Sequence, residues 1–218
     1  MDPRYEKLDA RTILLNVYLS QGIILLLGFL GLYFFYIRHG LGWADVFIPD
    51  RIMPSLLYGG AAAIVIIMVE VLLIVLLPKN TFDDGGLNEL LFRELSFWQI
   101  GIVALIVAFS EELLFRAVVQ PGIGLWWTSL LFAAIHVRYL RKWVMFFTVF
   151  LISLLFGWLF SRTGSIWTII WAHFLVDFLL GCFLRLGWFV SKEAGISAQE
   201  SNMEITEKEN QGCEKNHE

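Results

Sequence analysis

Two adjacent carboxylates and an arginine interrupt one apolar stretch of the chain, Ala108-Phe109-Ser110-Glu111-Glu112-Leu113-Leu114-Phe115-Arg116. On an α-helix, residues four apart share a face, so Glu112 and Arg116 can pair, while Glu111 projects about 100° away from Glu112. One carboxylate is then neutralised and the other stays free. A free carboxylate beside an imidazole can hold a water molecule and take its proton.

Two imidazoles follow these carboxylates along the chain. His136 lies four residues after Phe132, and His173 lies four residues before Asp177. Taken singly, each of these groups is equally well explained as a hydrogen-bonding or packing residue between helices. Together they indicate amide hydrolysis, because a second imidazole in the same cavity can donate to the oxyanion that forms when water adds to a peptide carbonyl.

A metal site is the alternative interpretation of the same residues. Carboxylates and imidazoles are ligands that Zn²⁺ binds in catalytic sites with an open water position. The spacing of the residues does not distinguish a divalent metal from metal-free hydrolysis, so no cofactor is certain. The possible ligands are Glu111, His136, His173 and Asp177.

The composition places this chemistry in a membrane. Of the 218 residues, 58% are hydrophobic and 17% are charged, which is too apolar for an ordinary soluble domain. The formal net charge of -4 arises in the last 28 residues, which hold seven Glu and three Lys. The membrane part is therefore neutral, and nothing suggests a nucleic-acid partner. Cys182 and Cys213 form no metal-binding or disulfide pattern.

Apolar runs predict an all-α, polytopic membrane bundle of about six transmembrane helices. We expect Pro121 and Gly122 to end the third of these spans. The predicted spans cover 12–37, 56–77, 97–119, 125–136, 143–160 and 166–189, with an interfacial helix at 87–96. The chain then divides into two N-terminal spans with the interfacial helix (1–96), a catalytic core of four spans (97–190) and a disordered polar tail (191–218).

Ionisable groups are unevenly distributed among these spans. The third, fourth and sixth spans each bring acid or imidazole groups toward the interior, whereas the first and fifth bring none. Glu70, in the second span, is expected to be protonated or to meet a polar neighbour rather than to act directly. No internal repeat is evident, which argues against a transporter built from two related halves.

Basic residues predict the orientation of the bundle. By the positive-inside rule, both termini lie in the cytoplasm, and the protein is a multi-pass integral protein of the cell membrane. Glu111 then lies beyond the midpoint of its span, toward the outer half. On the N-terminal side the basic residues are Arg4, Lys7, Arg11, Lys79, Arg93, Arg138, Arg141 and Lys142, against Arg38, Arg51 and Arg162 on the other.

Three motifs in order on successive spans resemble those of a known family. They are Glu111-Glu112-x-x-x-Arg116, Phe132-x-x-x-His136 and His173-x-x-x-Asp177. They resemble the motifs of the CPBP family, the CAAX proteases and bacteriocin-processing enzymes also called the Abi family, over about residues 97–185. Members are intramembrane endopeptidases, and the eukaryotic ones remove the last three residues of prenylated CAAX proteins.

The resemblance implies a role for each motif residue. Glu111 with His136 would activate the water, His173 with Asp177 would stabilise the oxyanion, and Glu112 with Arg116 would hold the site together, although the two glutamates could exchange roles. Family motifs often have Asn where this chain has Asp177. An ionised carboxylate cannot donate as an amide does, so Asp177 must be protonated, orient His173 or bind metal.

These observations predict an intramembrane endopeptidase, of glutamic type or a metalloprotease. Its partners would be membrane lipids and a membrane-associated protein or peptide substrate, possibly of the CAAX type. CAAX processing takes place on the cytoplasmic side, which conflicts with a site in the outer half of the bundle. The competing class is a non-catalytic membrane protein, either a bacteriocin-immunity factor or a proton-linked transporter.

Overall fold

Long apolar runs form the longest helices, because a backbone in lipid must satisfy its hydrogen bonds within its own segment. The computed structural model describes residues 9–47, 52–78, 81–82, 86–137, 140 and 142–188, which contain helices and no strand. The predicted all-α membrane bundle is confirmed, while the predicted tail lies outside the described residues. Four helices of the described part are long and apolar enough to cross a membrane: α1 (Ala10–Phe35) with η1 (Ile37–His39), α3 (Ile52–Leu76), α7 (Trp143–Thr163) and α8 (Ile166–Arg185).

The third and fourth predicted spans form one continuous, bent helical segment. It consists of α5 (Phe97–Glu112), the π-helix η3 (Leu113–Val119) and α6 (Gln120–Ile135). A capping box starts α5 where the sequence predicts: the Ser96 hydroxyl accepts from the Gln99 N–H at 3.3 Å, and the Gln99 side chain accepts from the Ser96 N–H at 2.8 Å.

The bend in this segment lies beyond the predicted position. Pro121 and Gly122 lie inside the helical region, so the prediction that they end the span is wrong. The backbone leaves helical geometry at Gly124, with φ 81° and ψ 169°. Glycine adopts a positive φ at no steric cost, whereas a proline early in a helix is tolerated. The glycine therefore sets where α6 turns back.

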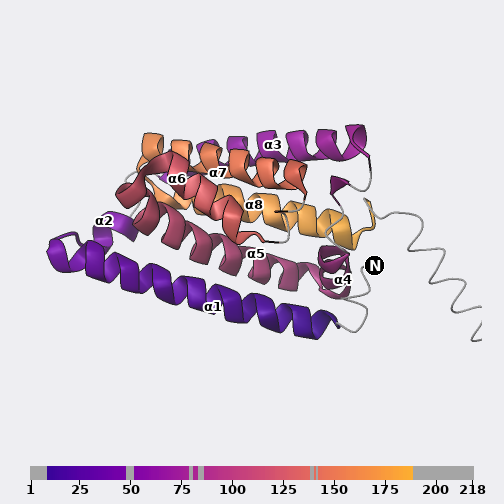
Figure 1. Cartoon of the computed structure of the whole chain (residues 1–218), viewed down its shortest axis with the longest axis horizontal. Coiled ribbons are helices and arrows are strands. Elements are labelled where there is room, and N and C mark those ends of the chain that lie inside the picture. The colour runs from indigo at the N-terminus through magenta and orange to yellow at the C-terminus, as the bar shows by residue number, and fades with distance from the viewer. Residues whose placement is uncertain are drawn as a thin grey trace, which may run out of the picture.

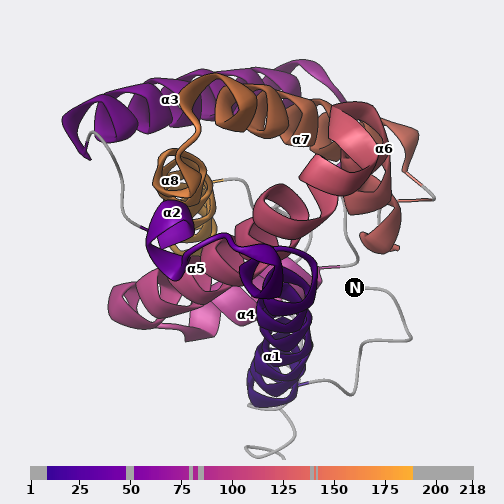
Figure 2. The ribbon, with the colours of Figure 1, turned by 90° about the vertical axis from the view of Figure 1, so that its left-hand side faces the viewer.

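Helix α8 is the centre of the bundle. It packs against α3, α5, α7 and the short helix α4 (Leu87–Glu94). Half of its most apolar window is buried, at 50%, against 17–22% for the other three candidate spans. The end-on view shows α8 between α3 and α5 (Figure 2). Residues on α8 therefore meet side chains from several helices at once.

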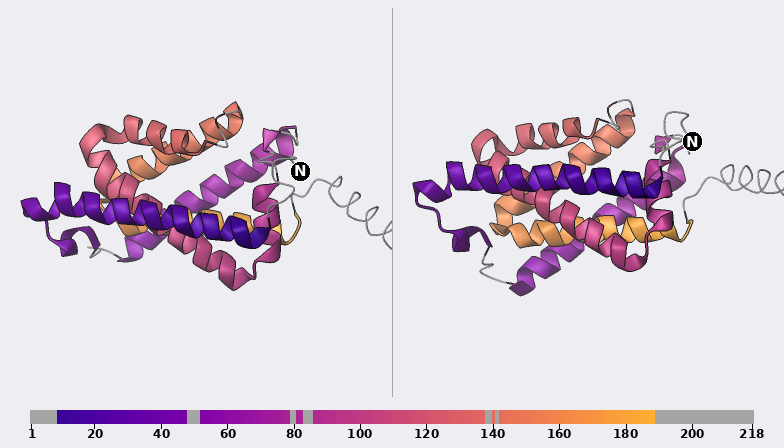
Figure 3. Two further views of the ribbon diagram at one scale, coloured as in Figure 1. Left: turned by 60° about the horizontal axis from the view of Figure 1, so that its bottom comes forward. Right: turned by 90° about the horizontal axis from the view of Figure 1, so that it is seen from below.

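Helix α1 covers one face of this arrangement. It packs against α5 and η3, and views from below show it lying across them (Figure 3). The other short helix, α2 (Trp43–Phe47), follows the far end of α1.

The start of α1, the helix α4 and the end of α8 lie together at one end of the bundle (Figure 1). We call this the α4 end.

Helix α4 occupies the place of the predicted interfacial helix. Its apolar side joins α1 and α5 in a cluster, and the Arg185 guanidinium donates to the carbonyl oxygens of Arg93, at 3.1 Å, and of Leu95. These bonds satisfy carbonyls at the C-terminal end of α4, which has no further turn to accept them. The members of the cluster are Ile13, Leu87, Leu91, Leu95, Ile100 and Val103.

Candidate active site

A buried ion pair joins the end of α5 to the π-helix. Arg116 Nε donates to Glu112 Oε2 at 2.8 Å, and both residues are 0% exposed. The pairing predicted from their spacing is confirmed. A buried pair is tolerated only when its remaining donors are also satisfied. Arg116 Nη2 donates to Ser153 Oγ of α7 at 3.0 Å, and the guanidinium lies 5.5 Å from the centre of the Phe132 ring.

Glu112 also reaches across to the central helix. Its second oxygen, Oε1, lies 2.9 Å from His173 Nδ1. Because a carboxylate only accepts, His173 carries a proton on Nδ1, and Nε2 is the nitrogen on the other side of the ring. That Nε2 lies 3.4 Å from Asp177 Oδ2, one helical turn further along α8. His173 is therefore held between two carboxylates.

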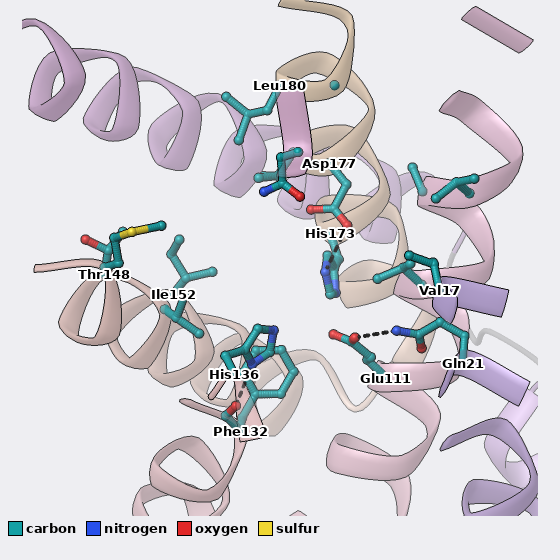
Figure 4. Close-up of a pocket in the computed structure, with 18 of the residues that line it drawn as sticks. Val17, Gln21, Glu111, Phe132, His136, Thr148, Ile152, His173, Asp177 and Leu180 are labelled. Atoms are coloured by element: carbon teal, nitrogen blue, oxygen red, sulfur yellow. Dashed lines mark hydrogen bonds and ion pairs between the residues drawn. The ribbon is translucent and has the colours of Figure 1, made fainter. Parts of the chain in front are cut away.

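Glu111 is bound from the opposite side by α1. Gln21 Nε2 donates to Glu111 Oε1 at 2.9 Å, and the Ser110 hydroxyl donates to Gln21 Oε1 at 2.5 Å. Gln21 is 7% exposed and Glu111 is 5% exposed. The other oxygen of Glu111 points into an open space bordered by His136 and His173 (Figure 4). Glu111 is the motif carboxylate that the ion pair leaves available.

His136 caps the end of α6. Its Nδ1 lies 2.7 Å from the carbonyl oxygen of Phe132, one turn back along the helix. Since a carbonyl only accepts, Nδ1 carries a proton. The ring borders the same space as Glu111, and the two groups interact electrostatically (Figure 4). An imidazole and a carboxylate thus face one another across that space.

These groups line a cavity of about 630 Å³. This volume lies within the ~300–1,000 Å³ of typical small-ligand pockets. Glu111, His136, His173 and Asp177 all contribute to its lining, which is otherwise largely apolar. Glu112 and Arg116 do not line the cavity and stand behind it. The six predicted site residues therefore form one cluster with four members at the cavity and two supporting them.

The cavity extends from Glu111 toward the α4 end. Asn88 and Phe92 of α4 and Leu184 of α8 belong to its lining. This is the end that the positive-inside rule predicts to lie in the cytoplasm; Lys79, Arg138 and Arg141 lie outside the described residues. A position of Glu111 beyond the midpoint of its helix is therefore compatible with access from that side.

The donors of the metal interpretation are partly engaged with other protein groups. Across residues 9–188 as described, no group of three or more His, Cys, Asp or Glu side chains is placed to hold an ion. Both ring nitrogens of His173 face carboxylates, and Nδ1 of His136 is bound to a backbone carbonyl. His136 and His173, two of the four possible ligands, thus each have at least one ring nitrogen facing another protein group.

Glu70 of α3 lines the cavity as well. It interacts electrostatically with Asp177, and its Oε2 is buried with no hydrogen-bond partner among the described atoms. The sequence places this carboxyl inside the second span but does not indicate that it faces the same cavity as the motif residues. Whether Glu70 faces the cavity depends on how α3 packs against α8.

Two supporting residues were not among the predicted site residues. Gln21 comes from α1 and Ser153 from α7, the two spans that bring no acid or imidazole. Both are polar side chains within apolar helices, and such residues usually hydrogen-bond across helices. The sequence shows that Gln21 and Ser153 are polar residues in apolar spans, but it does not indicate which partner each of them contacts.

The fold and the cluster define a polytopic membrane protein with a buried carboxylate and imidazole centre. Residues 88–179 match the family described as type II CAAX prenyl endopeptidase Rce1-like. The chain is 38% identical over 156 residues to an uncharacterised protein, YpbD, of Bacillus subtilis (strain 168), covering 71% of this chain and 80% of the relative. No solved structure matches.

The chain therefore belongs to the CPBP family, as its three motifs indicate, and within that family it is similar to the Rce1-like endopeptidases. This membership supports a protease function of the CAAX type for an integral membrane protein.

Proposed function

We propose that this protein is an intramembrane endopeptidase that hydrolyses peptide bonds of membrane-associated proteins or peptides with a water molecule activated by Glu111 and His136. The observation that carries the proposal is the orientation of Glu111. One of its oxygens is fixed by Gln21, and the other points into the cavity bordered by His136 and His173 (Figure 4).

Water activation is the first step. The water would be held between Glu111 Oε2 and His136 Nε2, and Glu111 would take its proton as the hydroxyl oxygen bonds to the substrate carbonyl carbon. The carbonyl π electrons move onto oxygen and give a tetrahedral oxyanion. General bases of this kind contribute roughly 10²–10⁴-fold in rate. Glu111 then returns the proton to the leaving amine as the C–N bond breaks.

Oxyanion stabilisation falls to His173. Its Nδ1–H is fixed by Glu112, so a proton on Nε2 would donate to the oxyanion at the cavity side. Arg116 neutralises Glu112 and thereby keeps that carboxylate charged and in place. Fixed donors of this kind stabilise a transition state without having to reorient during the reaction.

The sequence leaves three roles open for Asp177: to be protonated, to orient His173 or to bind metal. We assign it the orienting role. Asp177 Oδ2 lies 3.4 Å from His173 Nε2 and can accept from a proton on that nitrogen. The Asp177 carboxylate therefore holds that proton on His173 Nε2, where the oxyanion needs it. No metal is required by this scheme, and we propose a protease of the glutamic type.

The test uses the full chain purified in detergent with a quenched peptide library. Glu111→Ala and His136→Ala are expected to abolish cleavage while leaving the thermal transition in place. Cleavage that survives either substitution would overturn the mechanism. Dialysis against a chelator is expected to leave the native rate unchanged, and a loss restored by zinc would instead favour the metalloprotease.

The cavity suggests the side of access. We place the α4 end and both termini in the cytoplasm, and the protein in the plasma membrane, so that a substrate anchored in the inner leaflet reaches Glu111. With the two native cysteines replaced by serine, Asp45→Cys near the opposite end should react with a membrane-impermeant maleimide on intact cells. Glu94→Cys on α4 should react only after lysis, and the reverse pattern would invert the topology.

A further inference from the structure

Gln21 brings an amide from the first helix into a site that the motif residues otherwise build alone. It lies 90 positions before Glu111 and is buried at 7% exposure. A buried amide is unfavourable unless its polar atoms are bonded. Here both ends are used, since Nε2 donates to Glu111 at 2.9 Å and Oε1 accepts from Ser110 at 2.5 Å.

The neighbours of Gln21 select one orientation of its amide. If the amide were reversed, its oxygen would face the Glu111 carboxylate, and two acceptors would oppose each other. In the orientation present, the Ser110 hydroxyl donates to the amide oxygen and the amide nitrogen donates to the carboxylate. Ser110 can also donate to the carbonyl of Ile106 at 2.8 Å, which would release this constraint.

The amide in turn fixes the Glu111 carboxylate. The terminal torsion of a glutamate is broad and roughly two-fold, so an unrestrained carboxylate presents either oxygen in a range of directions. A donor on Oε1 restricts this rotation and leaves Oε2 toward the cavity (Figure 4). The other charged or titratable groups that face Glu111 are His136 of α6 and His173 and Asp177 of α8.

We propose that Gln21 is a positioning residue for Glu111: its amide, oriented by Ser110, holds the catalytic carboxylate so that one oxygen meets the water. This inference rests on the proposed role of Glu111 as the base. Gln21 lies outside residues 88–179, the region that matches the family. The first helix is thus part of the catalytic apparatus of this chain and not only a membrane anchor.

The principal variant is Gln21→Met, which keeps the length of the side chain and removes both polar atoms. It should lower kcat about 10- to 100-fold, the range expected when a hydrogen bond to a charged group is lost, and leave KM within about 2-fold. The matched control is Asn16→Leu, which removes an exposed amide from the same helix. That control should keep the native kcat.

Ser110→Ala separates a positioning role of Gln21 from a purely structural one, because only the positioning role predicts a change in kcat for this variant. It should lower kcat by about 3- to 10-fold, because the amide is then free to reverse. The double variant of Ser110→Ala with Gln21→Met should be no slower than Gln21→Met alone, because Ser110 acts through Gln21. Gln21→Asn, which keeps an amide on a shorter side chain, replaces Gln21→Met if that variant does not fold.

Each outcome bears on one of the two proposals. A native kcat for Gln21→Met, with Glu111→Ala inactive, would overturn the positioning role and leave the endopeptidase mechanism intact. Losses that add in the double variant would show that Ser110 does not act through Gln21. A loss of kcat that follows a lowered melting temperature in Gln21→Met would assign Gln21 to folding. Either result would also overturn the positioning role. Cleavage by Glu111→Ala would overturn the mechanism on which the inference rests.

Discussion

Glu112 Oε1 and His173 Nδ1 lie 2.9 Å apart, and this contact joins α5 to α8, 61 positions later in the chain. The same carboxylate binds Arg116 through its other oxygen. Glu112 therefore links a buried cation to an imidazole at the cavity, without lining the cavity itself. The two adjacent glutamates thus have different surroundings, one paired behind the cavity and one facing into it.

Substitution of Glu112 should affect folding more than substitution of Glu111. Glu112→Gln leaves the Arg116 charge buried without a counter-ion, and breaking such a pair typically costs about 3–5 kcal/mol. Glu111→Gln is the matched control, since it changes the neighbouring residue in the same way without breaking an ion pair. Thermal unfolding in detergent should show a large loss only for Glu112→Gln, whereas both variants should lose cleavage. Equal melting temperatures would contradict the assignment.

Asp177→Asn should keep most of the activity. An amide at this position can still accept from His173 Nε2–H and can itself donate toward the oxyanion, so kcat is expected to stay within about 10-fold of native. Asp177→Leu, which removes both capacities, should lose about 100-fold or more. If Asp177→Asn were as inactive as Asp177→Leu and zinc affected the native rate, the carboxylate would be a metal ligand instead.

Glu70→Gln should stabilise the protein. The Glu70 carboxyl is buried and lies within electrostatic range of Asp177, so a charge on it is both desolvated and repelled by a like charge. Removing the charge should raise the melting temperature by several degrees, at about 2–4 °C for each kcal/mol in a chain of this length. A native melting temperature with slower cleavage would show that Glu70 contacts substrate.

Two adjacent glycines on α3 should respond oppositely to alanine. A Cβ on Gly59 would lie 2.5 Å from the backbone oxygen of Thr168 on α8, whereas the nearest atom to a Cβ on Gly60 is 4.0 Å away. Gly59→Ala must separate α3 from α8, at an expected cost of about 1–3 kcal/mol. Gly60→Ala should be neutral or stabilising, because alanine favours helix. Equal melting temperatures would mean that this close approach is absent in the folded protein.

Local spacing accounts for much of what the sequence predicts correctly. The helices follow from apolar runs, and α5 begins at Phe97, where the third span was predicted to begin. The pairing of Glu112 with Arg116 was predicted from their four-residue spacing, and His173 and Asp177, at the same spacing, also lie close together. Such contacts depend on helix geometry, which is the same wherever the helix lies in the protein.

The position of the bend is less predictable. Pro121 and Gly122 are strong turn signals, yet the chain stays helical through them and bends at Gly124. The π-helix that contains Arg116 comes directly before this region, and no local pattern indicates it. Several conformations are compatible with these residues in isolation, and in the one adopted α6 bends at Gly124 and packs against α7.

The sequence by itself determined a helical membrane bundle, its family motifs and the candidate residues for the chemistry. Only the tertiary structure decided which of them meet: Glu112 with His173, Glu111 with Gln21, and Glu70 with the same cavity. The physical reason is that contacts between helices depend on the rotation and tilt of each helix against its neighbours. These are set by packing of the whole bundle and not by the spacing of residues along one helix.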